Sequence, residues 1–337
     1  MKNKVIIIAE IGVNHNGNLI LAKKLIKQAK EAGADFVKFQ SFKVDELLIK
    51  NTKMASYQIN NLKKKKLTQY DMLSKYEIND NFHRSVINYS KFINIKFLTS
   101  PFDIKSINYL KKFKLNFFKI PSGEITNHPY LKQIGSMNKY TFLSTGMSTY
   151  IEVKNAVNIL IKSGLNKNKL YVLHCHTDYP SQFLDLNLNS IPYLRKKLKL
   201  KVGYSDHSLG HEASVAAVAL GSTVIEKHIT LNKNLPGPDH KASMEINDFK
   251  VFVKSIRNIE LALGDHKKLP TKKELKILKI VRKSIYAKLD IKIGEKFSEK
   301  NLTTKRPLNG ISADKWHLLI GKKALKNYKK NQPIKNY

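Results

Sequence analysis

The chain has 337 residues and a formal net charge of +35, from 61 Lys and Arg against 26 Asp and Glu. This length allows one large domain with a smaller second one. So positive a charge favours nucleic acid or an acidic membrane as partner, but the sequence has no zinc-finger spacing, no basic heptad helix and no aromatic RNA-binding motif. The lysines are scattered over expected helix faces, with one cluster at Lys63–Lys66, so we expect neither partner.

Cysteine usage and apolar runs bear on the compartment. Cys175 is the single cysteine, so neither an intrachain disulfide nor a thiolate metal cluster is possible, and a reducing compartment is expected. The apolar run Val5–Ala9 is interrupted by Glu10 and has no small-residue cleavage site after it, which makes it a poor signal peptide. No stretch approaches the roughly 18 apolar residues of a membrane span. The sequence therefore predicts a cytoplasmic protein.

One unit repeats from Val5 to Leu263: a short β-branched or aromatic run, a polar loop, and ten or more residues with helical spacing. The first helix, 19–32, places apolar residues four apart and ends at Gly33. Eight such alternations predict an α/β fold of the closed (β/α)8 TIM-barrel type rather than an open doubly wound sheet. The expected strands are Val5–Glu10, Asp35–Gln40, Lys96–Ser100, Phe117–Ile120, Tyr140–Ser144, Leu170–His174, Lys201–Ser205 and Thr223–His228.

Two segments depart from this repeat. Between Ser41 and Asp80 about 40 residues contain no strand, and an insertion after the second barrel strand is expected to lie over the mouth as a lid. After Gly264 the sequence changes to a linker with a helical stretch at 272–281, and then to short β runs, at Ile285–Ala287 and Lys305–Arg306, and glycine turns. A domain this small is expected to dock on another surface. The predicted parts are a catalytic barrel at 1–265, a linker at 266–283 and a small, mostly β domain at 284–337.

The carboxyl ends of the expected strands are unusually polar. In barrels of this class these ends and their loops form the open face, and catalytic residues come from them. A barrel end with a structural role alone would not need so many polar side chains. The polar residues at these ends are Glu10, Asn14, His15, Lys38, Gln40, Thr99, Ser100, Lys119, Ser122, Glu124, Ser144, Thr145, His174, His176, Thr177, Asp178, Tyr179, Ser205, Asp206, His207, Glu226 and His228.

The seventh and eighth strands each lead from apolar residues into a histidine, His207 and His228. A histidine considered alone is more often a packed or solvated ring. If the two strands are neighbours in one parallel sheet, however, their ends lie side by side and the two imidazoles can meet at a metal ion. Two protein nitrogens leave coordination positions open for water and substrate, which suits a Lewis-acid site better than a closed structural one.

Lys38 and Lys119 lie within apolar strands, where a buried ammonium group is costly unless it meets an anion. They therefore predict an anionic ligand. Two alternatives stay open: a Schiff-base aldolase that uses Lys119 or Lys38, and a basic barrel that binds nucleic acid or an acidic glycan. The serines that either belong to ordinary turns or add donors around a phosphate or carboxylate are Ser100, Ser122, Ser144 and Ser205.

Seven blocks stand in order along the chain, nearly without gaps: Ala9–Gly17, Phe36–Gln40, Lys119–Glu124, Leu143–Met147, Gly203–His207, Glu226–His228 and Gly237–His240. Together they resemble the signature blocks of the bacterial sialic acid synthase family, which includes N-acetylneuraminate and N,N'-diacetyllegionaminate synthases. The tail, with Lys305-Arg306-Pro307 and Asn309-Gly310-Ile311, resembles the C-terminal antifreeze-like (SAF) domain of that family, a small mostly β fold. The match covers the whole chain and is far more specific than any one block.

This resemblance implies an enzyme, a transferase that condenses phosphoenolpyruvate with an N-acylated mannose-type sugar. Water addition and phosphate release then give a nine-carbon 2-keto acid. It implies that His207 and His228 hold a divalent ion, manganese first and magnesium or cobalt as alternatives, which polarises the sugar aldehyde. Glu10 matches a carboxylate placed for proton transfer near that metal.

The resemblance also assigns substrate contacts. Arg306 matches an arginine that reaches from the small domain into the site of a partner subunit, which implies a domain-swapped homodimer and gives the small domain its docking surface. The residues that match phosphoenolpyruvate contacts are Lys38, Ser100, Lys119, Ser122, Ser144 and Ser205. Those that match sugar contacts are Gln40, Glu124, Tyr179 and Asp239.

Two departures from the family pattern bear on the substrate. Members that make N-acetylneuraminate usually carry Asn at the position of Thr177, which is a further candidate substrate contact. The sequence Asp178-Tyr179-Pro180 is closer to the branch that makes diacetyllegionaminic acid from a 2,4-diacetamido-trideoxy mannose. Leu308 replaces a usual glycine and changes the loop that would present Arg306. The sequence therefore favours N,N'-diacetyllegionaminate synthase, with N-acetylneuraminate and pseudaminate synthases as alternatives.

Overall fold

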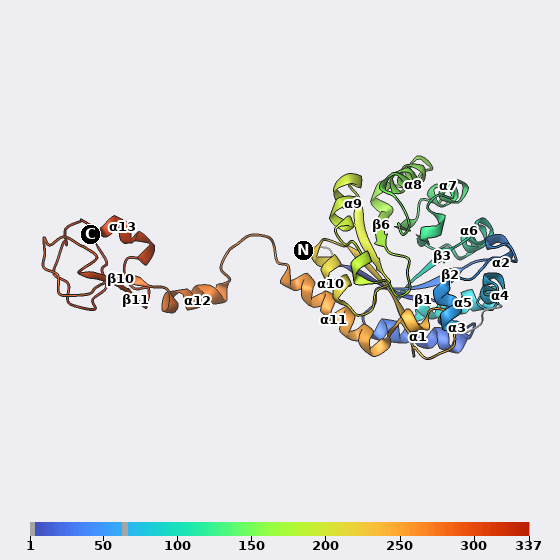
Figure 1. The fold of residues 1–337 in the computed structure, drawn as a ribbon, viewed down its shortest axis with the longest axis horizontal. Helices are drawn as coiled ribbons and strands as arrows, with labels where there is room; N and C mark the ends of the chain where they lie inside the picture. The colour runs from blue at the N-terminus through green and yellow to red at the C-terminus, as the bar shows by residue number, and fades with distance from the viewer. Residues whose placement is uncertain (1–3, 63–66, 337) are drawn as a thin grey trace. The chain divides into compact units, whose positions relative to one another are not determined.

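Eight parallel strands close into a barrel, which confirms the predicted fold class (Figure 1). The computed structural model describes residues 4–62 and 67–336, so the cluster Lys63–Lys66 lies outside the described residues. Each strand pairs with the next along the chain, and β1 also pairs with β8. A short strand, β9 (Met244–Glu245), adds to β8. The barrel strands are β1 Ile6–Gly12, β2 Phe36–Ser41, β3 Lys96–Pro101, β4 Phe117–Ile120, β5 Tyr140–Ser144, β6 Leu170–Cys175, β7 Lys201–Asp206 and β8 Val224–Thr230.

Helices alternate with the strands and surround the barrel (Figure 1). The first of them begins where the Asn18 side chain accepts hydrogen bonds from the backbone N–H groups of Ile20 and Leu21, and it is followed by Gly33 in a left-handed conformation. No helix among the described residues is long and apolar enough to cross a membrane. The helices are α1 Leu19–Glu31, α5 Asp80–Phe92, α6 Ile104–Leu110, α7 His128–Ser136, α8 Tyr150–Lys162, α9 Ser190–Leu198, α10 Glu212–Ala219 and α11 Ile246–Ala262.

Side chains alternate between two cores along each barrel strand. Outward-facing residues such as Ile7 and Val37 belong to the large core between strands and helices. Inward-facing residues such as Ile8 and Phe36 fill the lower barrel interior together with residues from other strands. The interior is tight at Gly203, where a Cβ atom would lie 2.6 Å from Leu173 Cδ2. This apolar filling makes the barrel a packed core and restricts open space to its carboxyl end.

The insertion between β2 and α5 contains short helices and no strand among its described residues: α2 (Val44–Leu47), α3 (Ser56–Leu62) and α4 (Gln69–Leu73). Asn61 Nδ2 in α3 donates a hydrogen bond of 2.6 Å to the carbonyl of Pro238, in the loop after β8. Residues of the insertion also line a cavity together with strand-end residues. The insertion therefore lies over the barrel mouth, as expected.

Contacts divide the chain after Gly264, and residues 265–337 form a second compact unit. It holds α12 (Lys272–Val281), the antiparallel pair β10 (Ser284–Ala287) and β11 (Leu302–Lys305), and α13 (Trp316–Leu319). The predicted run Lys305–Arg306 differs from the strand, since Arg306 lies after β11. The strand begins earlier because Leu302 is buried in the small core and pairs with Ala287. The apolar residues of this core are Ile285, Ala287, Ile291, Phe297, Leu302, Leu319, Ala324, Tyr328 and Ile334.

Candidate active site

A ring of polar side chains covers the apolar barrel interior. Because side chains on one face of a strand recur every two residues, Glu10 follows inward-facing Ile8 and Lys38 follows Phe36. The same step repeats around the barrel, and the ring lines a cavity of about 200 Å³, called here the lower cavity. The sequence-predicted residues that line it are Glu10, Lys38, Gln40, Ser100, Lys119, Ser122, Ser144, Thr177, Tyr179, Ser205, His207 and His228.

Both buried lysines of this ring meet carboxylates of the protein itself. Lys38 Nζ lies 2.9 Å from Glu10 Oε1 and 3.8 Å from Glu226 Oε1, and Lys119 Nζ lies 2.9 Å from Glu226 Oε1. Ser205 Oγ donates a further hydrogen bond of 2.9 Å to the same Glu226 oxygen. Burial of the two lysines therefore does not by itself require an external anion, since two carboxylates already balance the two ammonium groups.

Burial and pairing set the protonation states of this cluster. Burial alone would raise the pKa of Glu226, but Lys119 and Lys38 lower it to about 2, so this group is a carboxylate. Burial also works against a charged Lys38, yet Glu10 and Glu226 raise its pKa, whereas burial lowers the pKa of Lys119. Burial raises the pKa of Glu10, whose Oε2 atom has no hydrogen-bond partner. Glu10 is thus the carboxyl of the cluster that takes up a proton most readily.

The two predicted histidines meet at the edge of this cavity. The ring centroids of His207 and His228 are 5.5 Å apart. His207 Nδ1 lies 2.5 Å from the carbonyl oxygen of His176, which can only accept, so the proton is on Nδ1. The other nitrogen, Nε2, accepts from the Tyr179 hydroxyl at 3.0 Å. Burial lowers the pKa of His207 to about 4 and holds that of His228 well below its usual value, so both rings are neutral.

These imidazoles fit a divalent ion in type and charge. Neutral rings are the form that binds metal, the carbonyl behind His207 fixes its tautomer in the way common for metal-binding histidines, and His228 Nδ1 is buried with no partner. Across residues 4–62 and 67–336 no group of three or more His, Cys, Asp and Glu side chains is arranged to hold a metal. An ion here would take two protein nitrogens and would replace the hydrogen bond from Tyr179.

A second cavity, of about 310 Å³ and called here the upper cavity, adjoins the lower one. The residues that line both are Gln40, Phe102, Gly123, Tyr179 and His228. Glu124 and Asp239, which match sugar contacts, line only the upper cavity, and burial raises the pKa of Asp239 to about 7. All four residues that match sugar contacts line the upper cavity, whereas the six that match phosphoenolpyruvate contacts line only the lower one. Arg306 lies in the second unit, where its side chain is exposed.

Comparisons with known proteins decide the family. The NeuB family model matches residues 25–268, and the SAF domain model matches residues 282–336. The chain belongs to the NeuB family.

Relatives of this NeuB-family chain match it over nearly its whole length. The N,N'-diacetyllegionaminic acid synthase of Campylobacter jejuni is 51% identical over 98% of this chain and 99% of its own length. A protein of the same name from Legionella pneumophila is 42% identical over 95% of this chain and 90% of its own. The crystal structure of N-acetylneuraminic acid synthetase from Leptospira borgpetersenii, in complex with citrate, superposes with a TM-score of 0.71, covers 81% of this chain and 90% of its own, and is 32% identical.

Sequence reasoning missed three features of this NeuB-family site. Glu226, which holds both lysines, was noted as polar but not selected; it stands two residues before His228 on the same face of β8, and that period could have identified it. The His176 carbonyl that orients His207 is a backbone group and carries no sequence signal. The insertion residues that line the upper cavity were also missed, and they are Leu47, Leu48, Tyr57, Gln58, Gln69, Met72 and Leu73.

Some of the polar strand-end residues have structural partners away from both cavities. Asn14 Nδ2 donates to the Ile229 carbonyl and to Ser243 Oγ. His174 Nε2 lies 2.7 Å from the Leu186 carbonyl. His15 packs between Phe39 and Phe82. These residues brace the loops around the mouth.

Two buried histidines of the barrel, His15 and His83, predict a loss of stability in mild acid. Burial lowers the pKa of each from 6.5 to about 4. Above pH 6.5 both histidines are neutral in the folded and in the unfolded chain, so their titration does not affect stability. Below pH 6.5 they bind protons in the unfolded chain, whereas in the folded chain they stay neutral down to about pH 4, so stability falls. Each histidine should therefore cost roughly 2 kcal/mol between pH 7 and pH 5.

Urea unfolding at pH 7 and pH 5 checks this expectation. His83→Gln removes the titrating ring but keeps an amide that can reach Ser41 Oγ, which lies 2.8 Å from His83 Nε2. The variant should lose about 2 kcal/mol less than the wild type over this pH interval. Equal losses in the two proteins would contradict the assignment of His83 as a buried neutral ring.

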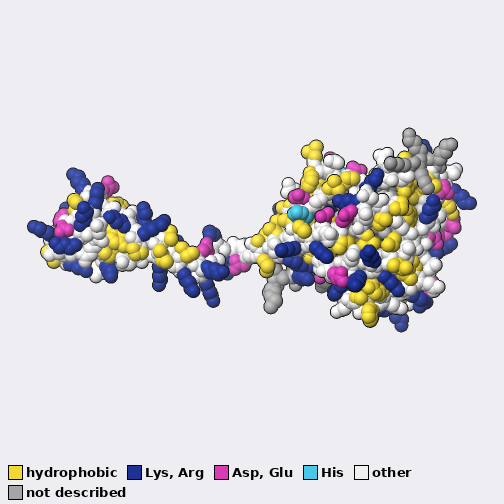
Figure 2. Space-filling model, turned by 90° about the horizontal axis from the view of Figure 1, so that it is seen from below, with side chains coloured by type: hydrophobic (Ala, Val, Ile, Leu, Met, Phe, Trp, Pro, Cys, Tyr) yellow, Lys and Arg dark blue, Asp and Glu magenta, His cyan; other side chains and the backbone are white. Residues whose placement is uncertain are grey.

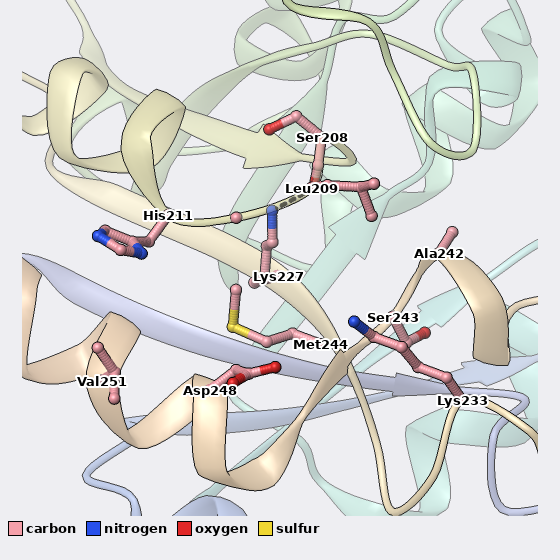
Figure 3. Close-up of a pocket in the computed structure, with 11 residues that line it drawn as sticks. Ser208, Leu209, His211, Lys227, Lys233, Ala242, Ser243, Met244, Asp248 and Val251 are labelled. Carbon is pink, nitrogen blue, oxygen red and sulfur yellow. Dashed lines mark hydrogen bonds between the residues drawn. The ribbon is translucent and has the colours of Figure 1, made fainter.

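A separate cavity of about 270 Å³ lies on the outer face of β8 (Figure 3). Lys227 lines it, and its ammonium donates to Asp206 Oδ2 at 2.9 Å and to the Ser208 carbonyl. Asp206 directly precedes His207, and Lys227 directly precedes His228. The ion pair therefore joins the two histidine-bearing strands of the NeuB-family site on the face opposite to the imidazoles.

Proposed function

We propose that this chain is a sialic-type acid synthase and, more specifically, an N,N'-diacetyllegionaminate synthase. Carbon 3 of phosphoenolpyruvate attacks the aldehyde of a 2,4-diacetamido-2,4,6-trideoxy mannose; water adds at carbon 2, and the C–O bond to phosphate breaks to leave a 2-keto acid. The observation that carries this proposal is the pair of adjoining cavities. One is lined by lysines and serines, and the other by the residues that match sugar contacts in the family. The Campylobacter relative supports the choice of sugar.

Phosphoenolpyruvate is assigned to the lower cavity. Lys38 and Lys119 offer two ammonium groups at its centre, and their carboxylate partners hold them in place before the anion arrives. Ser144 Oγ is buried without a hydrogen-bond partner, so it has a donor available for the ligand. Ser122 Oγ accepts a hydrogen bond of 3.0 Å from the Gly146 N–H, so the hydroxyl proton of Ser122 can point toward a ligand. Fixed donors of this kind stabilise charge without reorganisation.

The sugar is assigned to the upper cavity, with its aldehyde at the residues that both cavities share. Gln40 Nε2 donates to Glu10 Oε1 at 3.2 Å, so the amide links a proposed sugar contact to the proposed proton carrier. Glu10 lies beside His228 in the β1–β8 register. The uptake of a proton by Glu10 is therefore placed close to the aldehyde oxygen.

A divalent ion, manganese first, is proposed at His207 and His228. When bound, such an ion acts as a Lewis acid that polarises a carbonyl oxygen. The protein's own contribution is to keep both rings neutral through burial and to orient His207 through the His176 carbonyl. Arg306 and a domain-swapped homodimer remain part of the proposal, as does the assignment of Glu124 and Asp239 to sugar contacts.

The alternatives have less support. Burial lowers the pKa of Lys119, which suits a Schiff-base nucleophile, but its ammonium is paired with Glu226 at 2.9 Å. Borohydride trapping with substrate would identify such an imine. On the face drawn in Figure 2, Lys and Arg side chains stand among apolar and uncharged polar ones across the barrel. This pattern differs from the single basic stripe typical of nucleic-acid binding.

Phosphate release from phosphoenolpyruvate tests the function. The protein is assayed with manganese and with N-acetylmannosamine, 2,4-diacetamido-2,4,6-trideoxymannose and an altrose-type analogue. We expect release to depend on the sugar and to be fastest with the diacetamido mannose. No sugar-dependent release with any of the three would overturn the proposed function, and a preference for the altrose-type sugar would favour a pseudaminate synthase.

A further inference from the structure

The insertion supplies one side of the upper cavity with apolar side chains. We call Leu47, Leu48, Met72 and Leu73 the apolar wall; they come from α2, the residue after it, and α4. Met72 is 1% exposed. Leu47 and Leu73 pack against the small cluster of buried residues that contains Val13. The wall is therefore held in place by packing against other side chains of the protein and does not depend on a ligand.

The upper cavity also has polar lining residues, which come from both the insertion and the barrel: Tyr57, Gln58, Gln69, Gln40, Glu124, Tyr179, His228 and Asp239. Gln40, Tyr179 and His228 line both cavities, whereas the apolar wall lines the upper one alone. In the proposed reaction the sugar aldehyde must reach carbon 3 of phosphoenolpyruvate in the lower cavity. The aldehyde end of the sugar therefore lies at the shared residues, and the far end of its six-carbon chain extends toward the wall.

We propose that the apolar wall determines sugar specificity: it selects acceptors that carry a methyl group at carbon 6 and an acylamino group at carbon 4. This inference rests on the proposed function and adds the residues that read the distal end of the sugar, with Met72 and Leu48 as specificity-determining residues.

Elementary solvation explains the selection. A hydroxyl at carbon 6 that meets the apolar wall would exchange water for carbon and sulfur atoms, which offer it no hydrogen bond, whereas a methyl group gains contact there. The methyl of a 4-acetamido group gains in the same way. Gln69 also lines the upper cavity, and among the described residues its side-chain amide has no hydrogen-bond partner, so it can serve the amide of that group. Apolar pockets reject an added hydroxyl by about 100-fold at most, which sets the expected scale.

The test compares kcat/KM for 2,4-diacetamido-2,4,6-trideoxymannose and for N-acetylmannosamine, measured as phosphate release by the full chain. The wild type should prefer the deoxy sugar by about 10-fold to 100-fold. Met72→Gln, which keeps the length of the side chain but adds a polar amide, should reduce this preference about tenfold. The change should appear as a raised KM for the deoxy sugar, with KM for phosphoenolpyruvate unchanged.

Met54→Gln is the matched control, because Met54 is buried in the same insertion but does not line either cavity. Its preference should equal that of the wild type. Leu48→Asn repeats the test at a half-buried position in case Met72→Gln fails to fold. An active wild type that prefers N-acetylmannosamine, or wall variants with unaltered preference, would overturn this inference and leave the synthase function standing. A wild type that releases no phosphate with either sugar would instead overturn the function itself.

Discussion

Lys119→Met is expected to reduce kcat/KM for phosphoenolpyruvate by about 100-fold to 1,000-fold, the usual effect of losing one charged donor at a developing anion. Lys119 is 3% exposed and lines the lower cavity. Its removal deletes half of the positive charge there and leaves Glu226 with Lys38 at 3.8 Å as its remaining cation. The loss should appear as a raised KM for phosphoenolpyruvate, because the enolpyruvate phosphate would meet a carboxylate whose remaining cation is 3.8 Å away. KM for the sugar should stay close to the wild-type value.

The matched control is Lys227→Met, which removes another buried lysine from a barrel strand but on the outer face. Lys227 is 2% exposed and pairs with Asp206, which also accepts hydrogen bonds from Ser208 and Ser214. Breaking a buried ion pair costs roughly 3–5 kcal/mol of stability. Because the two serines still donate to Asp206, we expect this variant to lose about 3 kcal/mol, the lower end of that range. It should lose stability while keeping its KM for phosphoenolpyruvate. Wild-type phosphoenolpyruvate kinetics in Lys119→Met would contradict the assignment of the lower cavity.

The fold could be predicted from the sequence because its signals are local. Each barrel strand is a short β-branched or aromatic run next to a helix with clear spacing, and two of the predicted runs, Phe117–Ile120 and Tyr140–Ser144, coincide with β4 and β5. Adjacent placement of the strands then follows from the barrel topology. The meeting of His207 and His228 needs only this step, since β7 and β8 are neighbours in both sequence and space.

The partners of the buried lysines could not be predicted in the same way. Glu226 lies 107 positions from Lys119 in the chain, and the two meet only because both point into a closed barrel. The apolar wall was missed for another reason. The helices α2, α3 and α4 have 4, 7 and 5 residues, which is too short to show a helical period. Their positions depend on tertiary contacts, such as the bond from Asn61 to the Pro238 carbonyl.

The metal proposal makes the second strong prediction: His207→Ala and His228→Ala should both lose manganese binding and turnover. With two protein nitrogens at the site, the loss of either ring removes half of the protein ligands. The affinity should therefore fall by more than the roughly 10-fold to 100-fold that loss of an outer-shell partner costs. Manganese binding is measured directly by electron paramagnetic resonance of the free ion, so the result does not depend on activity. Chelator should abolish turnover of the wild type, and added manganese should restore it.

His176→Ala separates a ring that holds metal from a residue that only orients one. The carbonyl of His176 accepts from His207 Nδ1, whereas its imidazole contacts Ser181 Oγ at 3.1 Å and the Asp178 N–H. Truncating the side chain leaves the carbonyl in place, so manganese affinity should stay within a few-fold of the wild type, and turnover should persist. Full turnover in chelator, or unchanged manganese binding in His207→Ala and His228→Ala, would show that the paired imidazoles have a role other than metal binding. Lys38, Lys119 and Glu10 would then have to carry the chemistry without a cation beside them.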